Sequence, residues 1–206
     1  MPKTPGQILI VSATDSEMIL EEFQGADKLV SGVGMVPTTT ALTKQLVKSD
    51  FDLVINIGIA GSFNSELSIG NVTQVTSDKL VEVGVEDNGK FIPADEIGLC
   101  SIVDVQFETN QRVLDLPKVN GITVNRVHGS VDSIHNVVDQ FNPDMESMEG
   151  AAVAYVCQQF GIPWVQIRAI SNKVEVRNRD SWNIPLAIKN LHTVVTKYLK
   201  CLDLEA

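Results

Sequence analysis

The chain has 206 residues, 44% hydrophobic and 20% charged, which is typical of a globular protein with one substantial core. Its formal net charge of −10 disfavours nucleic acid and anionic membranes as partners, because both are negatively charged. The apolar runs are shorter than the roughly 20 residues of a membrane span, and Met1-Pro2-Lys3-Thr4-Pro5 has no signal-peptide core. We therefore expect a cytoplasmic protein that binds a small molecule, with residues 1–206 as one domain.

Neither a metal nor a cofactor is expected. The cysteines lie far apart and have neither disulfide nor metal-ligand spacing: Cys100, Cys157 and Cys201. The histidines fit no metal-binding motif either: His128, His135 and His192.

The first 61 residues alternate apolar runs of strand length with helical patterns. The predicted elements are a strand over Gln7–Ser12, a helix continuing through Met18, Ile19 and Glu22, a helix over Pro37–Lys48 and a strand over Asp52–Ile57. A glycine loop, Ser31-Gly32-Val33-Gly34, precedes the second helix, and a second, Gly58-Ile59-Ala60-Gly61, follows the second strand. Either glycine loop alone is explained by a tight turn.

The rest of the chain begins with a β-rich stretch, Val72 to Phe107, which we expect to be antiparallel or irregular, with a turn at Asp87-Asn88-Gly89. The later predicted elements are a strand over Ile122–Val127, a loop over His128–Asn142, a helix over Met148–Phe160, a strand over Trp164–Ile170 and a helix over Ile184–Cys201. This alternation predicts an α/β fold of three layers, with a mixed, mainly parallel sheet between helices.

Ligands of such sheets bind beyond the carboxyl ends of the strands. Residues from four separate loops fall there: Glu17, Gly58 to Gly61, Ser130 and Asn172.

Two interpretations stay open for Glu17. Thr14-Asp15-Ser16-Glu17 has the spacing of a capping box, with Thr14 as N-cap. A carboxylate just after the first strand can also orient and deprotonate a water molecule. Glu149 is similarly ambiguous, because a carboxylate at a helix start is favourable on dipole grounds, while its two oxygens suit a pair of vicinal hydroxyls.

Two stretches, Ser147-Met148-Glu149-Gly150-Ala151-Ala152 and the strand ending in Ser171-Asn172, resemble the purine nucleoside phosphorylase/5′-methylthioadenosine nucleosidase family. Ile10 to Glu17 is similar to the opening of the nucleosidases, in which the last Glu is the general base. The resemblance implies a phosphorylase-like fold and a homodimer or larger homo-oligomer. It also implies a nucleoside site formed by Glu17, Gly58, Ile59, Ala60, Gly61, Ser147, Met148, Glu149, Ser171 and Asn172. Phe141 is a candidate for stacking on the base, with loop packing as the alternative.

The nature of the nucleophile is indicated by the arginines. Residues 1–111 contain no arginine, whereas the phosphorylases of this family hold phosphate with arginines from the first half of the chain. Guanidinium groups match phosphate oxygens, although lysine can also bind phosphate. The pattern therefore favours water as the nucleophile.

Asn172 bears on which base is released. The resemblance places Asp at this position in adenine-cleaving members, where a protonated Asp donates to N7 and accepts from the exocyclic amine. A neutral 6-oxopurine instead presents two acceptors, N7 and O6, which suit the NH2 of an amide. Asn172 therefore favours hypoxanthine over adenine.

The chain resembles one branch of the family in particular, the futalosine hydrolases, through Gly58-Ile59-Ala60-Gly61-Ser62-Phe63, Val127-His128-Gly129-Ser130 and Ser171 to Asn178. That substrate carries a benzoate, so Arg177 or Arg179 is a candidate for its carboxylate, with a solvated loop as the alternative. Three other functions stay possible interpretations of the sequence: a nucleosidase for methylthioadenosine or adenosylhomocysteine, an inosine-type phosphorylase, and a non-catalytic nucleoside-binding protein.

Overall fold

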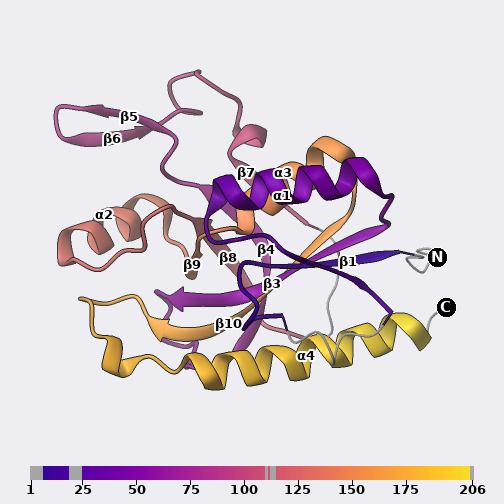
Figure 1. The fold of residues 1–206 in the computed structure, drawn as a ribbon. Helices are drawn as coiled ribbons and strands as arrows, with labels where there is room; N and C mark the ends of the chain where they lie inside the picture. The colour runs from indigo at the N-terminus through magenta and orange to yellow at the C-terminus, as the bar shows by residue number, and fades with distance from the viewer. Residues whose placement is uncertain (1–6, 19–24, 110, 112–114, 205–206) are drawn as a thin grey trace.

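The structure is a computed structural model that describes residues 7–18, 25–109, 111 and 115–204 (Figure 1). The strands are β1 Ile8–Ser12, β2 Asp27–Val30, β3 Leu53–Ser62, β4 Val72–Leu80, β5 Gly84–Asp87, β6 Lys90–Pro93, β7 Gln106–Glu108, β8 Lys118–Thr123, β9 Met145–Ser147 and β10 Trp164–Lys173. The α-helices are α1 Met35–Lys48, α2 Val131–Phe141, α3 Gly150–Phe160 and α4 Ile184–Leu204. Two short 3-10 helices are η1 Ile102–Asp104 and η2 Arg179–Ser181.

Five strands of the main sheet close into a ring. The strand order is β10-β4-β8-β9-β3-β1-β2, and β10 is also hydrogen-bonded to β3. The parallel pairs are β1–β2, β1–β3, β3–β10, β4–β8 and β8–β9. The antiparallel pairs are β4–β10, β3–β9 and β4–β7. The mixed α/β fold is therefore confirmed, whereas a simple three-layer stack is not established, because the sheet closes on itself.

The alternation of apolar residues along the strands divides the core in two. On β1, Leu9 belongs to a cluster beneath α1 and α3, while its neighbour Ile10 belongs to a cluster beneath α4. Figure 1 shows α1 and α3 on one side of the strands and α4 on the other. The central strands β1, β3 and β10 are thus buried on both faces, which is why they read as nearly continuous apolar runs.

Two strands extend further than the sequence predicts. Gly58 to Gly61 is not a loop but the second half of β3, and Ser171 and Asn172 belong to β10. The two extensions pair with each other, with a register shift between Ile170 and Asn172. This mutual hydrogen bonding keeps the glycine-containing segment extended.

The segment predicted as a loop over His128–Asn142 contains α2. Its ends carry clear signals: Ser130 accepts a hydrogen bond from the N–H of Ser133, and Asn142 closes the helix in the left-handed conformation. The preceding strand, predicted over Ile122–Val127, ends earlier, at Thr123. Met148 and Glu149 were expected to begin α3, but they precede it, with Glu149 as the N-cap.

The predicted turn at Asp87-Asn88-Gly89 is confirmed, since β5 and β6 form a hairpin in which Asn88 and Gly89 have positive φ. The helical pattern predicted after β1 falls largely on residues 19–24, outside the described residues. Within the described part of the chain, no helix combines the length and apolarity needed to cross a membrane.

Candidate active site

Glu17 is held by two separate segments of the chain. Its Oε2 accepts hydrogen bonds from the backbone N–H of Thr14 at 3.0 Å and from the Thr14 hydroxyl at 2.8 Å. Its Oε1 accepts from the N–H of Ile59 at 3.0 Å. The bond from the Thr14 N–H to the Glu17 carboxylate is one half of a capping box, here within a turn, while the bond from Ile59 fixes the carboxylate at the end of β3. Both interpretations of Glu17 are therefore compatible with its geometry.

Glu149 lies buried close to Glu17. Its Oε1 accepts a hydrogen bond from the N–H of Gly34 at 2.9 Å. Burial raises the pKa of Glu149 above its usual range; the positive charge of Arg168 and the bond from Gly34 oppose this shift, and the negative charge of Glu17 adds to it. Glu149 thus lies in one cluster with Arg168 and Glu17.

Arg168 lies at the centre of this cluster. Its guanidinium is 1% exposed and donates to Oδ1 of Asn56. A Cβ placed on Gly58 would lie 2.1 Å from Nη1 of Arg168 and 2.9 Å from Oε1 of Glu17, so the two side chains meet in the space that this glycine leaves open. Arg168 was not among the site residues that the sequence analysis predicted. The available signal was a lone charge in a buried strand, which requires counter-charges nearby.

A second group of candidate residues meets over Gly61. A Cβ there would lie 3.1 Å from Nδ2 of Asn172 and 3.7 Å from Cγ of Glu146. The Oδ1 atom of Asn172 accepts from the hydroxyl of Ser171 at 2.8 Å, and its Nδ2 donates to the carbonyl of Lys173 at 2.9 Å. These contacts assign the amide orientation, with the oxygen toward Ser171.

Glu146 and His128 form a pair that the sequence interpretation missed. Glu146 is 3% exposed, and its Oε1 accepts from the backbone N–H of His128 at 3.0 Å. Its Oε2 lies against Nδ1 of the same histidine. The sequence offered one signal, an acidic residue directly before the Ser147-Met148-Glu149 motif.

The start of α3, which carries Glu149 at its N-cap, is anchored by a buried polar network. The hydroxyl of Thr123 accepts from the N–H of Ala151 at 2.8 Å and donates to Oδ1 of Asp78 at 2.9 Å. Nε2 of Gln166 donates to Oδ2 of Asp78 at 3.0 Å. Burial raises the pKa of Asp78 to about 6, despite these hydrogen bonds. Ser147 also contributes, since its hydroxyl oxygen accepts from the N–H of Gly150 at 3.3 Å.

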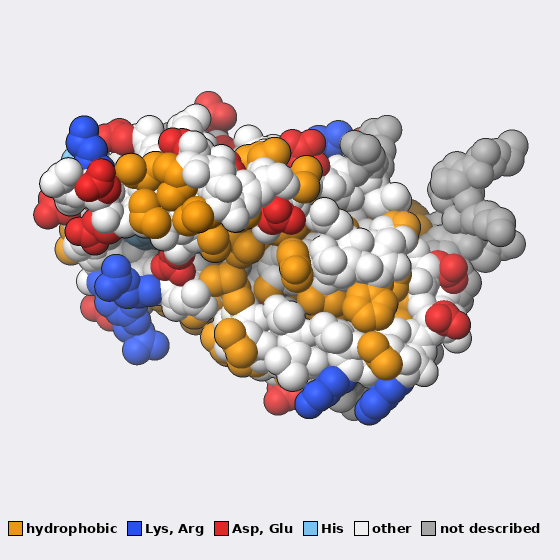
Figure 2. Space-filling view, turned by 90° about the horizontal axis from the view of Figure 1, so that it is seen from above, with side chains coloured by type: hydrophobic (Ala, Val, Ile, Leu, Met, Phe, Trp, Pro, Cys, Tyr) orange, Lys and Arg blue, Asp and Glu red, His pale blue; other side chains and the backbone are white. Residues whose placement is uncertain are grey.

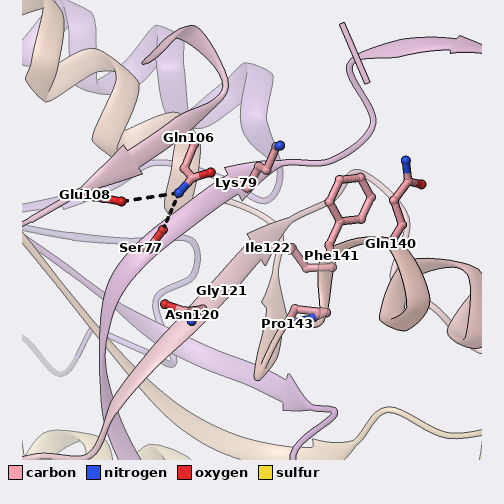
Figure 3. A pocket seen from close by; sticks show the side chains of 10 residues that line it. All are labelled: Ser77, Lys79, Gln106, Glu108, Asn120, Gly121, Ile122, Gln140, Phe141 and Pro143. Carbon is pink, nitrogen blue, oxygen red and sulfur yellow. Dashed lines mark hydrogen bonds between the residues drawn. The ribbon is translucent and has the colours of Figure 1, made fainter. Parts of the chain in front are cut away.

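Phe141 lies apart from the other candidate residues. It lines a cavity of about 430 Å³, and the ammonium group of Lys79 lies 5.5 Å from the centre of its ring. Figure 3 shows Phe141 beside Lys79 and Gln140, over strands β4 and β8. The cavity is lined by Ser77, Lys79, Gln106, Glu108, Asn120, Gly121, Ile122, Gln140, Phe141 and Pro143. No other predicted site residue lines this cavity.

Arg177 is exposed and its guanidinium lies 5.5 Å from the centre of the Trp182 ring. Its backbone N–H donates to the carbonyl of Gly129 at 3.3 Å, which brings the segment after β10 against the His128–Ser130 loop. Arg179 lies in η2 and is also exposed.

Met148 is half-buried next to Glu149. Over the residues that the structure describes, no group of three or more acidic, histidine or cysteine side chains is arranged to hold a metal ion.

Comparisons with known proteins place the chain in one family. The family model described as the phosphorylase superfamily matches residues 28–200. A 5′-methylthioadenosine/S-adenosylhomocysteine nucleosidase of Shewanella oneidensis is 32% identical over 179 residues, which cover 81% of this chain and 74% of the relative. A futalosine hydrolase of Acidothermus cellulolyticus is 29% identical over 176 residues, covering 81% of this chain and 72% of the relative.

Solved structures show the same fold. A nucleosidase of Neisseria meningitidis in complex with methylthio-immucillin-A has a TM-score of 0.81 at 19% identity, covering 95% of this chain and 99% of that one. The futalosine hydrolase of Helicobacter pylori has a TM-score of 0.79 at 20% identity, covering 97% and 98%. The sequence-matched relatives named above are hydrolases of N-glycosyl bonds, so the expected enzyme class is confirmed by them. The chain belongs to the phosphorylase superfamily.

Proposed function

We propose that the protein is an N-ribosyl hydrolase that cleaves a purine nucleoside, with Glu17 and Glu149 as its central carboxylates. The observation that carries this proposal is the buried cluster in which Glu17 and Arg168 meet over Gly58 and Glu149 lies close by. As the bond between the ribose C1′ and the purine N9 breaks, the sugar becomes an oxocarbenium-like cation. Two nearby carboxylates stabilise that positive charge, and their effect is strong because the buried site excludes most water.

In this mechanism Glu17 orients the attacking water and accepts its proton. Its carboxylate is immobilised by Thr14 and Ile59, so little reorganisation is needed on reaching the transition state. The guanidinium of Arg168 lies near this carboxylate, beside the space that Gly58 leaves open, and offers donors for the lone pairs of the water. Glu149 accepts hydrogen bonds from the 2′- and 3′-hydroxyls of the ribose, with Met148 packed against the sugar.

The charges of the cluster support water rather than phosphate as the nucleophile. Glu17 and Glu149 carry two negative charges when ionised, and Arg168 supplies one positive charge. A phosphate dianion placed there would meet a site of the same sign, whereas a neutral water would not. The absence of arginine from residues 1–111 is consistent with this assignment.

Within this class, we propose futalosine as the substrate and hypoxanthine as the released base. Asn172 supports this assignment, because its NH2 group can donate to N7 or O6 of a 6-oxopurine as negative charge builds on the leaving base. The exposed Arg177, stacked beside Trp182, is the candidate for the substrate carboxylate. If Arg177→Ala and Arg179→Ala both leave KM for futalosine unchanged, the carboxylate assignment is wrong.

The experiment that tests the function is product chromatography. The protein is incubated with futalosine, methylthioadenosine, adenosylhomocysteine and inosine, each with and without phosphate. We expect hypoxanthine from futalosine at a rate that phosphate does not change. Adenine release from methylthioadenosine as the fastest reaction would instead support the nucleosidase reading, which the name of the Shewanella relative favours. Strict phosphate dependence would support a phosphorylase, and no base release from any of the four a binding protein.

We further propose that the protein assembles as a homodimer or larger homo-oligomer. The face above α1 and α3, seen in Figure 2, carries hydrophobic side chains among acidic ones. Exposed apolar residues on these elements and on η1 include Val36, Ile102, Val103 and Tyr155. Light scattering coupled to size-exclusion chromatography tests this proposal, and a monomer of 22.4 kDa would refute it.

A further inference from the structure

Glu146 is a buried ionisable residue that the mechanism above does not use, and it pairs with the half-buried His128. Glu146 lies on β9, and its two carboxylate oxygens face the backbone N–H and the Nδ1 atom of His128. The ring of Phe63 packs edge-on against the imidazole, with centroids 6.1 Å apart. Glu146 is therefore fixed in one orientation by His128, which is itself braced by an aromatic side chain.

Glu146 and Asn172 lie on opposite sides of the same glycine. In the sheet register, Gly61 of β3 is paired with Glu146 of β9 and with Asn172 of β10. Cγ of Glu146 and Nδ2 of Asn172 lie 3.7 and 3.1 Å from the point that a Gly61 side chain would occupy. The methyl carbon Cγ2 of Val174 lies 2.9 Å from the same point, so a flat ligand that contacts Asn172 beside it comes near the Glu146 side chain.

The edge of a 6-oxopurine has more hydrogen-bonding atoms than Asn172 alone can satisfy. N7 and O6 accept hydrogen bonds, and N1 carries a hydrogen to donate. The NH2 of Asn172 already donates one hydrogen to the carbonyl of Lys173, which leaves one hydrogen for N7 or O6, and its carbonyl oxygen accepts from Ser171. The N1–H consequently needs a separate acceptor, because a buried donor without a partner costs binding energy. A carboxylate is the strongest acceptor among the side chains.

Adenine has the opposite hydrogen-bonding character at N1. Its N1 carries a lone pair and no hydrogen, so a carboxylate facing N1 would be repelled. The same carboxylate that favours hypoxanthine therefore disfavours adenine.

We propose that Glu146 recognises the base by accepting the N1–H of a 6-oxopurine, and that His128 is the positioning residue that orients its carboxylate. This inference rests on the proposed nucleoside hydrolase function and adds a second specificity-determining residue to Asn172. Base choice is then set by two side chains on two strands that meet over Gly61.

The first test uses the wild-type protein and no substitution. Calorimetry measures the binding of hypoxanthine and of 1-methylhypoxanthine, in which a methyl group replaces the hydrogen on N1. We expect the methylated base to bind roughly 10- to 100-fold more weakly, the loss that accompanies a charge-assisted hydrogen bond. Equal affinities would overturn the proposal.

The second test uses Glu146→Gln. A carboxamide can accept from the N1–H of hypoxanthine or donate to the N1 of adenine, so it should discriminate poorly. We expect the ratio of kcat/KM for futalosine to kcat/KM for its 6-amino analogue to fall by roughly tenfold or more. Glu82→Gln is the matched control, because Glu82 is exposed and also accepts a backbone hydrogen bond, from Asn125, but is not paired with Gly61.

The outcomes separate this inference from the function on which it rests. If the wild-type protein releases no base from futalosine and does not bind hypoxanthine, the proposed base is wrong and the role of Glu146 with it. If the wild-type protein does release hypoxanthine and Glu146→Gln keeps the wild-type ratio, only the role of Glu146 is wrong. If the variant does not fold, the comparison of the two bases on the wild-type protein decides.

Discussion

Replacing Gly58 with alanine should disable the site through a single added carbon atom. The new Cβ would lie 2.1 Å from Nη1 and 3.3 Å from Cζ of Arg168. Reaching an ordinary non-bonded distance requires the guanidinium to move by about 1 Å or more. It has little freedom to do so, since Arg168 is 1% exposed and its Nη2 is bonded to Asn56.

Two magnitudes follow from this clash. A displacement of about 1 Å among groups that orient the reactants lowers activity by roughly 100-fold. Adding a methyl group to a filled interior also costs about 1–3 kcal/mol of stability. Gly58 has no positive φ, so the substitution introduces no backbone strain of its own, and both effects report on side-chain contact.

A double-mutant cycle with Arg168→Met is the decisive assay. Activity on futalosine and the free energy of unfolding in urea are measured for the two single variants, the double variant and the wild-type protein. Methionine carries no guanidinium, so Gly58→Ala should cost less stability in that background than in the wild-type protein, by about 1 kcal/mol or more. Equal costs in the two backgrounds would refute a clash between the Gly58 position and Arg168.

Four further outcomes are expected. Glu17→Gln should lower kcat by roughly 10²- to 10⁴-fold with little change in substrate affinity, measured by single-turnover kinetics and calorimetry. Asn172→Asp should lower kcat/KM for futalosine. A value equal to that of the wild-type protein would show that the amide does not recognise the base. Because burial raises the pKa of Asp78 from 3.8 to about 6, the folded state binds the proton more tightly. Stability should therefore fall by about 3 kcal/mol as pH rises from below 4 to above 6, and urea unfolding of Asp78→Asn should lack this component. Burial also raises the pKa of the Cys157 thiol to about 12, so under native conditions this cysteine should resist alkylation, as followed by mass spectrometry.

The sequence predicted the framework of the fold because its strands are buried on both faces. The runs containing β1, β3 and β10 could be recognised from apolar composition alone, and α1 and α4 from their helical spacing. The continuation of β3 through Gly58 to Gly61 could not, since glycine favours turns unless a neighbouring strand holds it extended. The closure of the ring by β10 depends on tertiary pairing and leaves no local signal.

The candidate site, like the fold, could be predicted from the sequence only in part. Glu17 and Glu149 were identified by resemblance of their motifs, and the structure places them close together. Arg168 and Glu146 were missed as site residues because their position depends on which glycines they face, Gly58 and Gly61, and that is set by strand register. Phe141 was proposed from its residue type alone; its ring lies beside Lys79, and its stacking on the base stays a prediction.

If Asn172 and Glu146 recognise the base as proposed, the convergence of β9 and β10 on Gly61 constrains how base preference can evolve in this chain. A change from Asn172 to Asp alone would leave a carboxylate at Glu146 facing the N1 lone pair of adenine. A change at Glu146 alone would leave an amide suited to a 6-oxopurine. Neither single step would give a site selective for adenine, so a switch of substrate would pass through an enzyme that is less active or less selective. The two residues are expected to change together in descent.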